Sequence, residues 1–195
     1  MTSADSVCFL DKEEVRIGEF PDVGPVLDIG GGGEGIVGLL AGEKTISVDR
    51  SPRELKEAPE GPRKVAADAR ALPFPDRVFP LAVAFFTLLY LPGREDLDRL
   101  FEEAARTLRP EGRFLIWDAE LPVRPDGDTS EAVALPLRVI AAGREIETGY
   151  GVRWPRETRA AEEVLRLARR AGFEGRVMER SGRTYRIDLR LREER

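Results

Sequence analysis

The stretch "VLDIGGGGEGIVGLL", Val26 to Leu40, joins a short apolar run containing one acid to four consecutive glycines. Val26 to Ile29 predict a buried strand, and the apolar residues after Gly35 predict one face of a helix. Glycine loses more conformational freedom on folding than any other residue, so this run indicates a turn whose backbone makes a close approach. The helix behind the turn offers free N–H groups and a positive dipole end. We therefore expect the turn to bind a ligand.

Strands and helices continue to alternate along the chain. Further strands are predicted at 44–49, 64–68, 81–86 and 113–118, with one helix whose N-cap is Ser51 and another over 94–108. A last helix ends at Gly172, and two strands joined at Ser181–Gly182 close the chain. This order predicts an α/β fold: a Rossmann-like, doubly wound, seven-stranded and mostly parallel sheet with an antiparallel C-terminal hairpin. Ligands of such sheets bind at the carboxyl ends of the strands.

Composition narrows the possible functions. The 195 residues are expected to form a single domain, and the net charge of −5 gives no general attraction to nucleic acid. Histidine is absent, which removes the usual general base and the commonest metal ligand. Cys8 is the only cysteine, so neither a disulfide nor a metal site is predicted. No signal peptide is visible and the longest apolar run, Leu81 to Leu91, is too short to span a bilayer, so we expect a cytoplasmic protein with no membrane partner.

The glycine pattern is compatible with a dinucleotide ligand, but one residue beside it argues against this ligand. Gly30, Gly32 and Gly35 satisfy G-x-G-x-x-G, and Asp49 lies downstream where a ribose-binding acid of a dinucleotide site is expected. Asp28 argues against a dinucleotide, because its charge would repel a pyrophosphate two residues before the first glycine. The sequence therefore points away from a dinucleotide.

Four segments resemble, in order, the motifs of the class I S-adenosylmethionine-dependent methyltransferases, in particular the small type 11 group. They are "VLDIGGGGEG", "ISVDRSP", "VAADARALPFPDRVFPLAVAFFTLLYL" and "ARTLRPEGRFLIWD". The resemblance covers residues 24–118 well and 156–192 more loosely. Two positions depart from the family pattern: Glu34 stands where the third glycine is usual, with Gly35 one place later, and Pro80 replaces a common Asp.

The resemblance implies S-adenosylmethionine as the cofactor and assigns residues to its parts. The cofactor-binding candidates are Asp28 for the ammonium, the backbone of Gly30, Gly31 and Gly32 for the methionine part and ribose, Asp49 for the ribose hydroxyls, Arg50, Asp68 and Ala69 for adenine, and Phe85 beside the methionine part. Each side chain also has a purely structural interpretation: a turn or helix cap for the acids, and core packing for Phe85.

The implied activity is methyl transfer to a small-molecule acceptor, with S-adenosylhomocysteine as the product. No catalytic residue is predicted, although Thr87 is a candidate polar contact and Tyr90, Asp118 and Glu120 are candidate bases near the strand ends. The alternatives are a degenerate module that binds cofactor or a partner without catalysis and, less favoured, a NAD(P)-dependent oxidoreductase.

Substrate contacts are expected from two segments outside the repeating pattern, the lead-in 1–24 and the insertion 119–155. The insertion reads as a hairpin turning near Ala142–Gly143, and it carries Glu145, Glu147, Tyr150 and Trp154. These side chains form either a substrate wall or ordinary packing. No basic patch with interleaved aromatics is present and no Asn/Asp-Pro-Pro-Tyr motif follows the fourth strand, so a small molecule is favoured over nucleic acid. The oligomeric state is not predicted.

Overall fold

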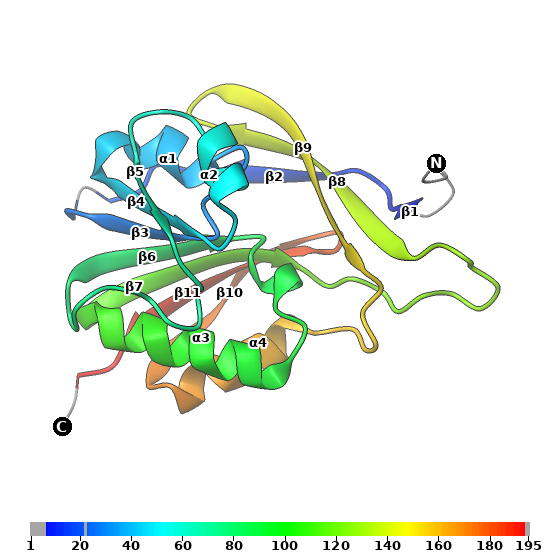
Figure 1. The fold of residues 1–195 in the computed structure, drawn as a ribbon. Helices are drawn as coiled ribbons and strands as arrows, with labels where there is room; N and C mark the ends of the chain where they lie inside the picture. The colour runs from blue at the N-terminus through cyan, green and yellow to red at the C-terminus, as the bar shows by residue number, and fades with distance from the viewer. Residues whose placement is uncertain (1–6, 22, 194–195) are drawn as a thin grey trace.

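The glycine-rich turn follows a strand in the interior of a seven-stranded sheet (Figure 1). The computed structural model describes residues 7–21 and 23–193. The sheet has the order β10-β11-β7-β6-β3-β4-β5. Its strands are β3 (Val26–Ile29), β4 (Thr45–Asp49), β5 (Arg63–Ala66), β6 (Phe79–Phe85), β7 (Leu108–Ala119), β10 (Phe173–Ser181) and β11 (Thr184–Leu191). The first five are parallel, and β11 pairs antiparallel with both β7 and β10, which confirms the predicted fold class.

Helices cover both faces of this sheet (Figure 1). On one side lie α3 (Arg94–Thr107) and α4 (Ala161–Arg170), and on the other α1 (Ile36–Ala41) and α2 (Pro52–Glu57); the short 3-10 helices are η2 (Gly42–Lys44) and η3 (Leu88–Tyr90). The apolar face predicted for α3 is buried at Leu97, Leu100, Phe101 and Ala104. These side chains pack with rings from the sheet, such as Phe114, because the helical spacing aligns them on one stripe.

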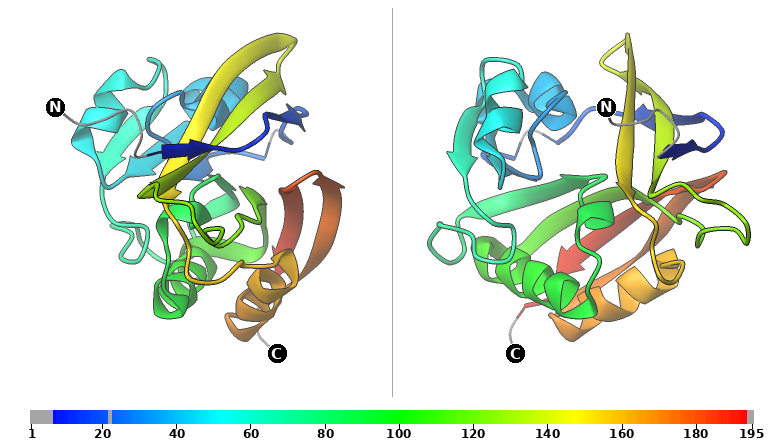
Figure 2. Two further views of the ribbon diagram at one scale, coloured as in Figure 1. Left: turned by 90° about the vertical axis from the view of Figure 1, so that its right-hand side faces the viewer. Right: turned by 45° about the vertical axis from the view of Figure 1, so that its right-hand side comes forward.

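A second, four-stranded sheet lies on the same side as α1 (Figures 1 and 2). Its strands are β1 (Val7–Phe9), β2 (Glu13–Ile17), β8 (Ala132–Ala141) and β9 (Arg144–Arg153). The hairpin β8–β9 turns at Ala142 and Gly143, with φ of +50° and +71°, at the predicted place. β9 pairs with β8 over its whole length, so β1 and β2 follow one another along the opposite edge of β8, both parallel to it. The sequence had indicated only a short lead-in before residue 25.

The second sheet buries its inner face against the seven-stranded sheet. Along β8, buried residues alternate with half-buried ones, as a strand with one covered face requires. The buried set packs on β6 and β7 and forms a second core: Val133, Leu135, Leu137 and Val139 against Leu81, Val83, Leu115 and Trp117. The sheet thereby covers the part of this face that α1 leaves open.

Two strands begin earlier than the sequence predicts. β6 starts at Phe79, and Pro80 sits at an irregularity in its pairing with β7, where its missing N–H costs no regular ladder bond. β7 starts at Leu108, directly after α3, and the break expected at "RPEG" appears as a φ of +63° at Glu111 within the strand. Among the described residues, no helix is long and apolar enough to cross a membrane.

Candidate functional site

The glycine turn is held against the neighbouring strand ends. The N–H groups of Gly30 and Gly31 both donate to the carbonyl of Val48 on β4, at 2.7 and 3.1 Å. Gly30 has a φ of +80°, and a Cβ there would lie 2.4 Å from Oγ1 of Thr87. The Thr87 hydroxyl itself donates to the carbonyl of Ile29 at 2.6 Å. The first glycine is therefore required by both backbone conformation and space.

The next two glycines, Gly31 and Gly32, lie close to the carboxylates of Asp28 and Asp49. A Cβ on Gly31 would come within 2.1 Å of Asp28 Oδ2, and one on Gly32 within 2.9 Å of Asp49 Oδ2. The structure thus brings together Asp28, Gly30, Gly31, Gly32 and Asp49 at the carboxyl ends of β3 and β4; we call this set the β3–β4 site. The close approach that the glycine run indicates is made to these acids and, at Gly32, also to the side chain of Glu54.

Asp28 is a buried acid in the middle of β3. Its side chain is 1% exposed in relative terms and accepts a hydrogen bond from the Ser47 hydroxyl at 3.1 Å. Burial raises the pKa of Asp28 to about 7, against the lowering effect of Ser47, and the nearby charge of Asp49 raises it further. A cation placed beside Asp28 would favour its ionised form.

Asp49 divides its two oxygens between two roles. Oδ1 accepts from the backbone N–H of Ser51 at 2.7 Å, just before α2, which is the structural role the sequence allowed. The Ser51 side chain in turn accepts from the Glu54 N–H, so the predicted N-cap of α2 is confirmed. Oδ2 of Asp49 faces the turn at Gly32. The capping role therefore leaves one carboxylate oxygen at the β3–β4 site.

Asp68 lies just beyond β5 and is held by a residue that the sequence did not single out. Arg70 donates from Nε to Asp68 Oδ1 at 2.9 Å and from its terminal nitrogen to Oδ2 at 2.6 Å, and it also pairs with Asp96. These bonds lower the pKa of Asp68 to about 2, and the charge of Arg50 contributes to the same shift. Arg50, Asp68 and the adjoining Ala69 therefore lie along one edge, next to the end of β4. In the sequence, the only sign of this two-point contact is that Arg70 lies two residues after Asp68.

Phe85 belongs to an aromatic cluster beneath β9. It is 6% exposed, and its ring lies edge-on to those of Phe86 and Tyr150, with centroids 4.9 and 6.3 Å away. Phe86 has a φ of +53° and stacks on Tyr150 with centroids 5.0 Å and planes 5° apart. The structure thus gives Phe85 the packing role that the sequence allowed, and it places Tyr150 over the end of β6.

The three candidate bases have different surroundings. Asp118 is 1% exposed and accepts from the N–H groups of Leu88 and Ala119 at 2.9 and 2.8 Å, so it caps η3; burial raises its pKa to about 7. Glu120 accepts from the Ala161 N–H at the start of α4 and from Arg180. Both acids therefore join elements of the fold.

Tyr90, the third candidate, is 52% exposed on η3. Partial burial raises the pKa of its phenol, and the carboxylates of Glu34 and Glu54 add to the rise, while the Gly151 N–H donates to its oxygen and lowers it. Its phenol thus lies between the glycine turn and β9.

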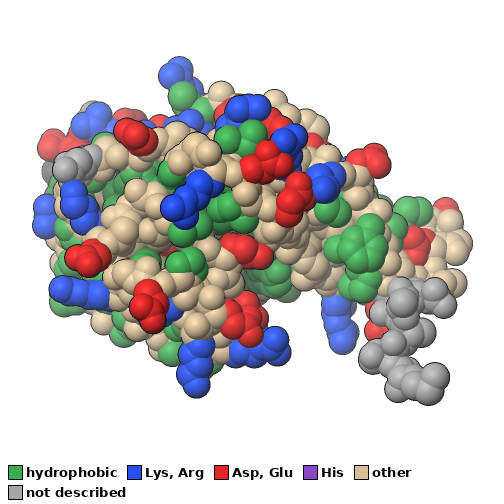
Figure 3. All heavy atoms as spheres, turned by 90° about the horizontal axis from the view of Figure 1, so that it is seen from above, with side chains coloured by type: hydrophobic (Ala, Val, Ile, Leu, Met, Phe, Trp, Pro, Cys, Tyr) green, Lys and Arg blue, Asp and Glu red, His purple; other side chains and the backbone are tan. Residues whose placement is uncertain are grey.

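Charges are mixed on the face that carries α1, α2 and the hairpin. Figure 3 shows acidic and basic side chains interspersed over this face, in keeping with the small net charge of −5. Ion pairs such as Lys12–Glu147, at 2.6 Å, account for part of the mixture. The described residues on this face form no basic stripe of the kind that follows a nucleic-acid backbone.

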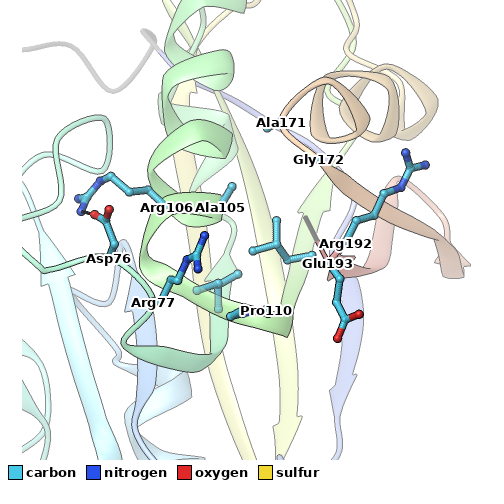
Figure 4. Close-up of a pocket in the computed structure, with 11 residues that line it drawn as sticks. Asp76, Arg77, Ala105, Arg106, Pro110, Ala171, Gly172, Arg192 and Glu193 are labelled. Carbon is cyan, nitrogen blue, oxygen red and sulfur yellow. Dashed lines mark hydrogen bonds and ion pairs between the residues drawn. The ribbon is translucent and has the colours of Figure 1, made fainter. Parts of the chain in front are cut away.

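A cavity of about 640 Å³ lies at the other end of the sheet (Figure 4). Leu108, which begins β7, and Leu191, which ends the antiparallel β11, both line it, so it opens at the amino ends of the parallel strands. Its remaining lining is Asp76, Arg77, Ala105, Arg106, Pro110, Ala171, Gly172, Arg192 and Glu193. None of these residues belongs to the predicted cofactor set.

With this geometry in place, comparison with known proteins identifies the domain. A model of the type 11 methyltransferase domain family matches residues 27–116, which run from β3 into β7. These residues thus match a methyltransferase domain. The PH0226 protein from Pyrococcus horikoshii OT3 superimposes with a TM-score of 0.65 at 20% identity, over 87% of this chain and 83% of that one. A SAM-dependent methyltransferase from Methanosarcina mazei gives a TM-score of 0.62 at 18% identity, over 90% and 96%.

One curated relative matches over a shorter segment. The sterol 4-C-methyltransferase strm-1 of Caenorhabditis elegans is 41% identical over 54 residues, which are 28% of this chain and only 15% of that protein. The methyltransferase family implies S-adenosylmethionine as the cofactor. The β3–β4 site fits this ligand, because Asp28 is a buried acid whose ionised form a cationic group would stabilise.

One position that departs from the family pattern, Glu34, lies in an extended turn. The turn continues through Gly33 and Gly35, with φ of +62° and +55°, and α1 begins at Ile36. Glu34 projects between them, and its Oε1 accepts a hydrogen bond from the Thr148 hydroxyl on β9 at 2.5 Å. The sequence singled out Glu34 as an irregularity, but not its partner 114 positions away.

Proposed function

We propose that this chain is an S-adenosylmethionine-dependent methyltransferase whose acceptor is a small molecule. The observation that carries the proposal is the pair of acids beneath the glycine turn: buried Asp28 and, beside it, Asp49 with one oxygen facing Gly32. Two carboxylates suit a ligand that carries positive charge and a ribose diol, and they disfavour a pyrophosphate.

The cofactor-binding roles follow the positions of the side chains. When bound, S-adenosylmethionine supplies a methyl group activated by a sulfonium. Asp28 holds the ammonium directly or through water, and Asp49 accepts from the ribose hydroxyls, for which a carboxylate has sufficient lone pairs. The backbone of Gly30 to Gly32 passes alongside the methionine part.

At the adenine end, Asp68 keeps acceptor capacity beyond its bonds to Arg70 and takes the amino group. Ala69 offers its backbone N–H, and Arg50 flanks the ring. The Phe85 ring packs against the rings of Phe86 and Tyr150. In this proposal Phe85 does not touch the methionine part itself and supports it through these two rings.

In this proposal the described residues form a single domain. The acceptor contacts the hairpin within residues 119–155 of that domain. We expect this approach to be lined by Tyr150 on β9, which stacks on Phe86, and by Tyr90 on η3. Asp118 and Glu120 are committed to backbone and Arg180 contacts, which favours an acceptor atom that needs no general base, such as a neutral amine nitrogen or a thiolate. The protein then contributes alignment and exclusion of water. A cytoplasmic location remains a prediction.

Isothermal titration calorimetry separates this proposal from its alternatives. We expect S-adenosylhomocysteine to bind with a one-to-one stoichiometry and NADH to give no heat. Asp49→Ala is expected to weaken S-adenosylhomocysteine binding at least 100-fold, because it removes the acceptor for two hydroxyls. Asp126→Ala, an exposed acid of the 119–155 segment, is the matched control and leaves the affinity unchanged.

Each alternative predicts a different pattern. NADH binding would support an oxidoreductase, and the absence of binding to either nucleotide would support an interaction module. Unchanged affinity in Asp49→Ala would remove the ribose assignment.

A further inference from the structure

The turn of the proposed cofactor site is tied to β9 by one side-chain hydrogen bond. Glu34 is exposed at the tip of the turn, between two glycines in the left-handed region, and accepts from Thr148 at 2.5 Å. Thr148 lies on the inner face of β9, because its cross-strand partner is the fully buried Leu137. The bond therefore joins the wall of the second sheet to the loop that would carry the cofactor.

Two further contacts join β9 to the elements around the β3–β4 site. Tyr150 stacks on Phe86, and the Gly151 N–H donates to Tyr90. Burial raises the pKa of the Tyr150 phenol well above its ordinary value, and the charges of Glu34 and Asp28 add to that rise. β9 thus lies beside the β3–β4 site at Thr148 and at Tyr150.

β9 is held by its ladder with β8 and by the packing of its inner side chains on the second core. Within the described residues β9 pairs with β8 alone, and its other edge has no ladder. A small displacement of β9 from the turn would break the Glu34–Thr148 bond and strain the stack of Tyr150 on Phe86, but it would break no pairing between β9 and the turn. An ordinary hydrogen bond has a net strength that corresponds to a two- to tenfold change in such an equilibrium.

We propose that the Glu34–Thr148 hydrogen bond is a latch that holds β9 beside the β3–β4 site and slows both entry and release of the cofactor. The inference rests on the proposed function, since it requires the cofactor to occupy this site. Glu34 is a positioning residue here: it acts through β9 and touches no reacting atom. Because the bond involves no cofactor atom, we expect its loss to change both rates by the same factor and to leave the equilibrium constant nearly unchanged.

The test measures association and dissociation rates of S-adenosylhomocysteine on the immobilised protein by surface plasmon resonance. Thr148→Val removes the donor and keeps the Glu34 charge, and we expect both rates to rise two- to tenfold while Kd changes less than twofold. Thr148→Ser keeps the hydroxyl and should restore the wild-type rates. Glu34→Gln keeps an acceptor oxygen and separates the effect of charge from that of the bond.

Two further variants complete the design. In the double variant Glu34→Ala/Thr148→Val, the second change should add nothing to the rates of Glu34→Ala alone, because either change breaks the same bond. Glu147→Gln breaks the neighbouring Lys12–Glu147 ion pair on the opposite face of β9 and is expected to behave as wild type. Melting temperatures of all variants show whether a rate change reflects lost stability.

The outcomes separate the latch from the function. If the wild type binds but Thr148→Val keeps wild-type rates, or if the two changes add, the latch is wrong and the proposed function stands. If the wild type does not bind S-adenosylhomocysteine, the proposed function fails, and the latch with it.

Discussion

The candidate site depends on the surroundings of single residues, and Asp28 is an example. It lies in a strand whose four residues are all buried, so its carboxyl loses most of its hydration and keeps one hydroxyl partner. Such a group is costly in the absence of a ligand. The cost is understandable if a cation completes the site, and this is why Asp28 and the glycines above it are best considered together.

Gly30 gives a test of the turn at this scale. Gly30→Ala introduces a Cβ in the left-handed region, 2.4 Å from the Thr87 hydroxyl oxygen, which is itself bonded to Ile29. We expect a loss of about 3 kcal/mol in the free energy of unfolding, from backbone strain and overpacking together. Urea denaturation measures the change.

Gly18→Ala is the matched control, since a Cβ at Gly18 meets nothing within 4 Å. It should change the stability by less than about 0.5 kcal/mol. A Gly30→Ala protein as stable as the control would show that the turn is not constrained as described.

At the scale of elements, the sequence predicted what depends on local pattern. The alternation of buried strands with amphipathic helices, the N-cap at Ser51 and the hairpin at Ala142–Gly143 were all recovered, because each is determined by neighbouring residues. The strands β1 and β2 were missed. Their pairing with β8 spans more than 100 residues, and in a segment such as "EEVRI" the alternation is limited to Val15 and Ile17, which is too short to indicate a strand by itself.

The candidate site was predicted to a similar extent. Asp28, Gly30 to Gly32 and Asp49 come together as expected, since consecutive parallel strands end at one edge of the sheet. The roles of Asp118 as the cap of η3 and of Arg70 as the clamp of Asp68 were not foreseen. Both depend on where a loop folds back, which residue spacing alone does not determine.

For the whole molecule, two buried acids determine how stability depends on pH near neutrality. Burial raises the pKa of both Asp28 and Asp118 to about 7, far above their usual value near 4. Between these limits the folded state holds protons that the unfolded chain has released, so the free energy of unfolding falls as pH rises through this window. The pKa of Asp68 is lowered to about 2, so this residue affects the free energy of unfolding only at lower pH. The chain has no histidine that would titrate between the two ranges.

We therefore expect the protein without cofactor to be less stable at pH 8 than at pH 5.5, by roughly 2 kcal/mol for each of the two acids. Denaturant unfolding at the two pH values measures the difference. Asp28→Asn should remove about half of it while leaving the Asp118 contribution. Stability that is constant or rises from pH 5.5 to pH 8 would show that these carboxyls do not stay protonated in the fold.

The most direct test of the account is a crystal structure of the protein with S-adenosylhomocysteine. We predict that the ligand lies across the carboxyl ends of β3 and β4, with both ribose hydroxyls within hydrogen-bond distance of Asp49 and the ammonium on the side of Asp28. A ligand bound elsewhere, for example in the cavity near Arg106 and Arg192, or with its ribose away from Asp49, would contradict the account.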